Sequence, residues 1–522
     1  MTTIPQAPLA TATAQQLKRH RLAIYTLSCV LSALLFCAFA TTNDLLNDDG
    51  INYIYAAHAL AEGLPEQAKS YRPETLFYRQ ITLLASLTNL ELYTSAQLLS
   101  LFWQAALACG FIAIVRSFDA SLQSQIIALA VFFSMASLNH LRPDIIRGFG
   151  FWALQLWAVW AGLAFIKNKT WWFALLWLGF SVASVIYRTE GIVYLLLIPF
   201  AALFGASYRD QGNALKSLKL GSAILLGSAF LWLLLSPELQ PASAELTPTA
   251  GFSSHDKLRH ELTTLRLAAS NFEQLKDAIS AQMPNKWAQR SINDVLIGGF
   301  IFHVLLTLLK ASNMPLMALS LYRNGVKRPF FSDPRHQLLA SYLLIGVMVG
   351  LLSVYNKYFV SQRYLMLTAI LISVPIALVL SHTYQRYANS ALTSARLWKC
   401  ALFALPLLAC LYPLSRQHDD KLYIQAAGEW VKTHLDDGQK IYFNSQKVAF
   451  YSDDYTNDSF KSAFQGMPSL LQEGYQYAVL YETGGAAIAL QQQPPVQALK
   501  TFHNRRGRSV KIYQLTAPGH VN

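Results

Sequence analysis

Charged residues and cysteines are scarce in this sequence, and their scarcity excludes whole classes of protein. Only 14% of the 522 residues are charged while 53% are hydrophobic, whereas a soluble domain carries about 25% charged residues. The composition therefore argues against a water-soluble globule. The five cysteines lie in apolar stretches, at spacings that suit neither a disulfide framework nor a metal cluster: Cys29, Cys37, Cys109, Cys400 and Cys410.

Acidic residues are fewer than basic ones, 29 against 42, which gives a net charge of +13. The sequence has no zinc-finger spacing or similar motif, so nucleic-acid binding does not explain this excess. In so apolar a chain, a basic excess is typical of loops held on the cytoplasmic side of a membrane.

Long apolar runs recur along the chain. A bilayer core about 30 Å thick needs roughly 20 apolar residues per helix, and backbone groups in lipid must pair within their own segment. We predict about eleven transmembrane helices: 22–42, 94–115, 123–140, 148–166, 171–187, 190–206, 219–236, 294–320, 337–355, 364–383 and 398–415. The run 294–320 is either one long tilted helix or a broken one.

Lysine and arginine residues set the orientation of the predicted helices. They precede the first helix and then recur in every second loop, which the positive-inside rule places in the cytoplasm. The N-terminus is then cytoplasmic, and the loops 43–93 and 237–293 face outward. The first helix ends in Ala38-Phe39-Ala40, like a signal-peptide cleavage site, but its apolar run is longer than usual for a signal peptide. We favour an uncleaved anchor, with cleavage as the alternative.

The tail is more polar than the rest of the chain. Residues at helical spacing follow Ile424, and the segments 440–443 and 477–481 have strand composition. The segments 499–502 and 509–515 flank a turn and suggest a hairpin. We therefore predict a transmembrane domain over residues 1–415 and a small extracytoplasmic α/β domain over 416–522.

Acids and arginines gather at the predicted outer ends of the helices. Asp48 and Asp49 precede a helical pattern that includes Tyr53. Either acid can cap that helix by accepting backbone N–H groups, or serve in catalysis. Asp144 and Arg147 follow Pro143, which suits a helix start, and at this spacing they would share one helix face, either as a salt bridge or as a site.

Further basic and acidic residues lie on the same side. Arg188 and Glu190 fall in a tight connection, where satisfied charges in a helical hairpin turn are the simpler interpretation. Other such residues are Arg72, ahead of an amphipathic stretch 76–87, and Lys357, Arg363 and Tyr364. Single charges at a membrane edge often only extend to water. A cluster of them more often lines a polar cavity, and arginines with carboxylates suit a lipid-linked phosphate substrate.

Several motifs resemble those of the C-type integral-membrane glycosyltransferases, which use polyprenyl-phosphate sugars. The run from Asp49 to Leu60, followed by Gly63, is similar to that family's first outer loop. Further motifs match in the family's order: Tyr71-Arg72-Pro73, Arg142-Pro143-Asp144, Arg188-Thr189-Glu190-Gly191 and Gln362-Arg363-Tyr364-Leu365. The tail is similar to the periplasmic domains of lipid A aminoarabinose transferases, and protein O-mannosyltransferases belong to the same group.

The resemblance implies an inverting hexosyl- or pentosyltransferase of the bacterial inner membrane, with the active site on the periplasmic face. Its donor would be a polyprenyl-phosphate sugar and its acceptor a hydroxyl of lipid A, a surface glycan or a protein. Catalytic roles would fall to Asp49, Asp48 and Asp144. Substrate-binding roles would fall to Tyr53, Arg72, Arg147, Arg188, Glu190, Lys357, Arg363 and Tyr364.

The sequence departs from the family pattern in its first outer loop. Gly50 stands where some members have a second acid, so either Asp48 substitutes for it or one carboxylate suffices. Arg72 replaces a lysine, and Glu74 replaces a second proline. Carboxylates suit Mg²⁺ or Mn²⁺, and whether the protein uses either ion stays open, although the missing acid argues against a required one.

Two other functions remain alternatives. A transporter or flippase of lipid-linked sugars would more often show repeats and charges near the membrane midplane, whereas here the charges gather at one edge. A polymerase or ligase that uses a diphosphate-linked donor is the other.

Overall fold

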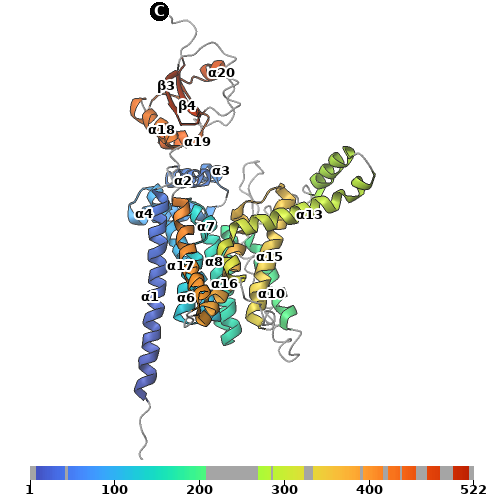
Figure 1. The fold of residues 1–522 in the computed structure, drawn as a ribbon. Helices are drawn as coiled ribbons and strands as arrows, with labels where there is room; N and C mark the ends of the chain where they lie inside the picture. Colours follow the sequence, from blue (N-terminus) through green and yellow to red (C-terminus); the bar gives the residue numbers. More distant parts are fainter. Residues whose placement is uncertain are drawn as a thin grey trace, which may run out of the picture. The chain divides into compact units, whose positions relative to one another are not determined.

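The chain folds into two compact units. Figure 1 draws the helices and strands of the computed structural model. The structure describes residues 7–41, 45–73, 75–206, 269–283, 286–321, 333–387, 392–414, 421–435, 438–453, 467–481 and 498–515. We call residues 1–35, 100–142 and 147–413 the bundle unit, and residues 36–99, 143–146 and 414–522 the sheet unit. The predicted domain division at 415/416 stays a prediction.

The apolar runs fold into helices, as the sequence predicts. Their bounds are α1 Ala7–Ala40, α5 Leu92–Phe118, α6 Leu122–Phe133, α7 Ala136–His140, α8 Gly148–Asn168, α9 Trp171–Tyr187, α10 Gly191–Ala206, α13 Lys286–Ala311, α14 Met314–Leu321, α15 Pro334–Lys357, α16 Gln362–Tyr387 and α17 Thr393–Leu414. Among the described residues, seven helices are long and apolar enough to cross a membrane. The chain is a polytopic, mainly helical membrane protein.

Two predicted spans are broken. The run 294–320 forms α13 and α14, which confirms the broken alternative, and the run 123–140 forms α6 and α7. The predicted span 219–236 lies outside the described residues. The break after α6 leaves carbonyl groups without helical partners, and side-chain amides satisfy them. Asn139 Nδ2 donates to the Phe133 carbonyl at 2.7 Å, and Asn313 Nδ2 donates to the Val131 carbonyl at 3.3 Å.

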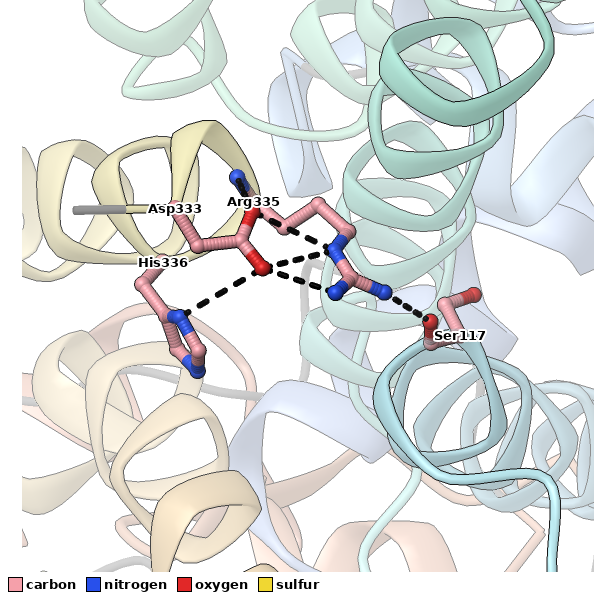
Figure 2. Close-up of polar contacts among 4 residues, drawn as sticks. All are labelled: Ser117, Asp333, Arg335 and His336. Carbon is pink, nitrogen blue, oxygen red and sulfur yellow. Dashed lines mark hydrogen bonds and ion pairs between the residues drawn. The ribbon is translucent and has the colours of Figure 1, made fainter. Parts of the chain in front are cut away.

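Arg335 joins two helices of the bundle unit, as Figure 2 shows. Asp333 is the N-cap of α15, where its carboxylate accepts the Arg335 N–H at 2.8 Å. The Arg335 guanidinium binds the same carboxylate and donates from Nη1 to the Ser117 carbonyl at 3.0 Å. That carbonyl belongs to the last turn of α5, where a positive charge is favourable. The start of α15 is thereby fixed to the end of α5.

The sheet unit contains a four-stranded sheet in the order β1-β2-β4-β3. The strands are β1 Ile441–Phe443, β2 Tyr477–Tyr481, β3 Ala498–His503 and β4 Ser509–Gln514, and the helices α2 Asp48–Ala61, α3 Pro65–Tyr71, α4 Thr75–Thr88, α18 Leu422–His434, α19 Gln446–Tyr451 and α20 Met467–Gln472 belong to the same unit. The first pair of strands is parallel and the others are antiparallel. Ile424 and Val431 of α18 pack on Val479 and Ile512 of the sheet. The predicted C-terminal α/β fold is confirmed.

Candidate functional site

Helix α2 begins with the two predicted acids. Asn47 is its N-cap residue, so of the two alternatives for Asp48 and Asp49 the structure does not support the N-cap. Both occupy the first turn instead, where the helix dipole favours negative charge. The Asn47 side chain binds elsewhere: its Oδ1 accepts the Ile145 N–H at 2.9 Å, and its Nδ2 donates to the Ile145 carbonyl at 3.4 Å.

The Asn47 contacts hold the segment that carries Asp144. This segment is not helical, because α8 begins only at Gly148. The prediction that Asp144 and Arg147 share a face of one helix is therefore wrong. Instead, Asn47 ties the residue after Asp144 to the residue before Asp48.

Gly50 lies close to the same segment. A Cβ atom on Gly50 would come within 3.0 Å of the Ile145 Cβ and 2.7 Å of Asn47 Oδ1. Real side chains almost never approach so closely, so Ile145 or Asn47 would have to move. A side chain at position 50, an acid included, would therefore require these neighbours to shift.

Asp49 forms an ion pair with Arg72, which follows α3. The Arg72 guanidinium lies over the Tyr53 ring, 4.8 Å from its centroid, and that ring packs edge-on against Phe77 at 4.8 Å. The Arg72 side chain is 21% exposed and the Asp49 side chain 40%. The Asp49 carboxylate therefore remains accessible, while the Arg72 guanidinium is held in place by the Tyr53 ring. Tyr53, a predicted substrate-binding residue, is 2% exposed and supports Arg72.

Asp48 points to a different part of the sheet unit. Its carboxylate pairs with Lys447 of α19 at 3.2 Å and is 73% exposed. One turn further along α2, the Asn52 side chain accepts a hydrogen bond from Gln446. These two residues of α19 were not predicted from the sequence, because nothing local links them to a helix about 400 residues earlier.

A second cluster of charged residues belongs to the bundle unit. Arg188, the C-cap residue of α9, donates to both carboxylate oxygens of Glu190 at 2.6 and 3.2 Å. Its guanidinium lies over the rings of Phe151 and Tyr364, at 5.5 and 4.9 Å from their centroids. Such a fork, held between aromatic faces, is well oriented for a planar or tetrahedral anion.

Lys357 and Arg147 add positive charge near this cluster, and Arg363 precedes one of its residues in the sequence. Lys357 Nζ donates to the Tyr364 hydroxyl at 3.3 Å and lies 5.1 Å from the centre of that ring. Arg147 precedes α8, and its charge acts on Glu190. Arg363 lies in the first turn of α16, next to Tyr364. The structure thus brings together Arg147, Arg188, Glu190, Lys357 and Tyr364, all predicted from sequence.

Arg142 was not a predicted site residue, but its hydrogen bonds fix the chain just before Asp144. It is 1% exposed, and its guanidinium donates to Asn139 Oδ1 at 2.8 Å and to Gln104 Oε1 at 3.1 Å. Gln104 in turn donates to the Arg142 carbonyl at 2.8 Å. These contacts fix the corner after α7, from which the chain continues to Asp144.

The charge of Glu190 is strongly stabilised. Burial alone would raise its pKa, but the charge and hydrogen bonds of Arg188, with help from Arg147, bring the pKa down to about 2. Glu190 lies in the connection between α9 and α10, outside both helices. The cluster therefore keeps its single carboxylate ionised at neutral pH, with an excess of positive charge around it.

A lowered pKa makes stability depend on pH in a defined direction. The ion pair stabilises the fold fully above the ordinary Glu pKa of 4.5, and its contribution is lost as the pH falls towards about 2. We expect Glu190→Gln to lower Tm by about 2 °C near neutral pH, and the difference from the wild type to shrink below about pH 4.5. Thermal unfolding of both proteins in detergent, from neutral pH to below about pH 4.5, measures this difference in Tm. A difference that grows with acidity would contradict the assignment.

The described residues do not provide a metal site. Across the part of the chain that the structure describes, no group of three or more His, Cys, Asp and Glu side chains could hold a metal ion. Asp48 and Asp49 are each paired with a basic residue.

Solved structures share this arrangement of helices. The structure of ArnT from Cupriavidus metallidurans bound to undecaprenyl phosphate is similar, with a TM-score of 0.57 at 9% identity, over 95% of this chain and 98% of that one. The chain has the C-type glycosyltransferase fold.

The C-type glycosyltransferase fold is also found in another neighbour. The Archaeoglobus fulgidus oligosaccharyltransferase tethered to an acceptor peptide has a TM-score of 0.53 at 12% identity, over 95% of this chain and 74% of that one. No family model and no curated protein matches the sequence. The fold that the sequence motifs imply is thus confirmed by structure, where overall sequence similarity is too low to show it.

Proposed function

We propose that this protein is an integral-membrane glycosyltransferase that moves a sugar from a polyprenyl-phosphate donor to an acceptor hydroxyl. The observation that carries the proposal is the accessible carboxylate of Asp49, paired with Arg72 at the start of α2. It occurs in a chain whose fold is shared with a protein that binds undecaprenyl phosphate.

Asp49 acts as the general base in this mechanism. The acceptor hydroxyl loses its proton to Asp49 while its oxygen forms a bond to the anomeric carbon. The bond from that carbon to the phosphate oxygen breaks, the polyprenyl phosphate leaves with the bonding electrons, and the anomeric configuration inverts. Arg72 pairs with Asp49 and holds it in place, and Asp144 orients the acceptor or the sugar.

The basic cluster of the bundle unit holds the phosphate. Negative charge grows on the leaving phosphate in the transition state, and fixed guanidinium and ammonium groups stabilise it. Arg188, Arg147 and Lys357 are the principal groups, with Arg363 beside them. Arg72, also predicted to bind substrate, pairs with Asp49 as Arg188 pairs with Glu190, and it lies beside the base.

The remaining features of the proposal follow the sequence. The protein lies in the bacterial inner membrane with a cytoplasmic N-terminus, and the α/β domain faces the periplasm. The acceptor is lipid A, another envelope glycan or a protein, and the transferred group is a hexosyl or pentosyl unit.

A reconstituted assay tests the proposal. Purified protein in proteoliposomes is given undecaprenyl-phosphate sugars labelled in the sugar, with an envelope lipid extract as acceptor source. We expect labelled acceptor and free undecaprenyl monophosphate, separated by thin-layer chromatography. Label that crosses the bilayer on unchanged lipid would show a flippase instead. Consumption of a diphosphate-linked donor alone would show the polymerase or ligase.

A further inference from the structure

Helix α19 lies in residues 416–522, which we call the C-terminal domain as predicted from the sequence, and it packs on α2 within the sheet unit. Besides the Asp48 and Asn52 contacts, the Tyr451 hydroxyl accepts the Leu46 N–H at 2.9 Å, just before α2 begins. The Phe450 ring lies 6.2 Å from that of Tyr55. One short helix therefore contacts three side chains of α2 and the backbone N–H of Leu46.

The position of α19 within its own domain is also closely fixed. A Cβ atom on Gly428 of α18 would lie 2.5 Å from the Tyr451 Cβ and 2.8 Å from the Val448 carbonyl oxygen. Only a glycine allows α18 and α19 to approach so closely. Helix α19 is therefore packed tightly against α18 of its own domain and contacts α2 at the same time.

The contacts divide α2 into two faces. Residues four apart share a helix face, and Asp48 and Asn52, with Tyr55 one turn later, all contact α19. Asp49 and Tyr53, also four apart, face Arg72. One face of the helix therefore contacts α19 of the C-terminal domain, while the neighbouring face carries the carboxylate of Asp49.

We propose that Lys447 and Gln446 of the C-terminal domain are positioning residues for Asp49. They act through α2: Lys447 holds Asp48, Gln446 holds Asn52, and together they set the rotation of the helix that aims Asp49. This inference rests on the proposed function, since it assigns Asp49 as the base. It gives Asp48 a structural task and makes the C-terminal domain part of the catalytic arrangement.

Lys447→Met in the full-length protein is the main test. A small rotation of α2 misplaces the base, and such misplacement is costly for a reaction that depends on orientation. We expect kcat for sugar transfer to fall by about tenfold, with the donor KM within about twofold of the wild type. Lys447→Arg, which keeps the charge, is expected to retain at least about half of kcat.

A matched control separates this role from general stability. Lys432 of α18 also forms an ion pair, with Asp453, but this pair lies within the C-terminal domain. Lys432→Met is expected to leave kcat unchanged. If both lysine variants lower kcat equally, or if Lys447→Met leaves kcat unchanged in an active protein, the proposal is overturned.

Hydrogen exchange provides a readout that does not depend on transfer. Amides of residues 48–61 are expected to exchange faster in Lys447→Met than in the wild type, and at the wild-type rate in Lys432→Met. Unchanged exchange in Lys447→Met would overturn the positioning role. A wild-type protein that shows no transfer in any assay would instead count against the proposed function, whatever the exchange result.

Discussion

Replacing Asp49 with Asn is expected to lower sugar transfer by about 10³-fold. An amide cannot accept the acceptor proton, and a positioned general base contributes roughly 10²–10⁴-fold to a rate. The fold should survive, because the Asp49 side chain is 40% exposed and the amide oxygen can still accept from Arg72. The measurement is the initial rate of labelled acceptor formation in proteoliposomes, alongside the thermal unfolding temperature of each variant.

Asp48→Asn is the matched control for this experiment. It changes the same chemical group one residue away, in the same turn of α2, but Asp48 faces Lys447. We expect a loss of at most about tenfold, no larger than that of Lys447→Met, because only the position of the helix changes and the amide oxygen can still accept from Lys447. If Asp49→Asn keeps more than a tenth of wild-type transfer, or if Asp48→Asn is the more damaging change, Asp49 is not the base.

Much of the helical fold could be predicted because the bilayer imposes a simple pattern. The predicted span 171–187 coincides with α9, since polar residues follow immediately at Arg188. The break at Ser134 was missed because the apolar run continues through it. What allows that break is distant in the sequence: the Asn313 side chain donates to Ser134 Oγ at 2.6 Å. Hydropathy does not record such a contact.

The two charged clusters show the same limit. Asp49 of the sheet unit and Glu190 of the bundle unit could each be found because charge is rare in this chain and therefore conspicuous. The residues that arrange them, such as Asn47 and Lys447, are ordinary polar residues in their own segments. Their role depends on tertiary contacts across about 100 and 400 positions of the chain. The sequence alone therefore identifies the charged groups better than it identifies the polar residues that orient them.

Arg188→Met is expected to weaken the binding of undecaprenyl phosphate by at least about tenfold. The change removes a charged fork that lies over the Phe151 and Tyr364 rings, and a charge-assisted bond contributes about 1.5–3 kcal/mol. It also leaves the carboxylate of Glu190, 26% exposed, without its partner. Stability should therefore fall as well, and Tm is expected to drop by several degrees.

A second substitution separates the two effects of Arg188→Met. Adding Glu190→Gln removes the unpaired carboxylate, so Tm should recover while the affinity for undecaprenyl phosphate stays low. Arg188→Lys keeps the charge but loses the paired hydrogen bonds, and we expect it to bind with intermediate affinity. Affinity is measured by titration of the detergent-solubilised protein with the lipid. Wild-type affinity in the double variant would show that Arg188 serves only the fold, because phosphate binding by its guanidinium cannot survive the loss of that group.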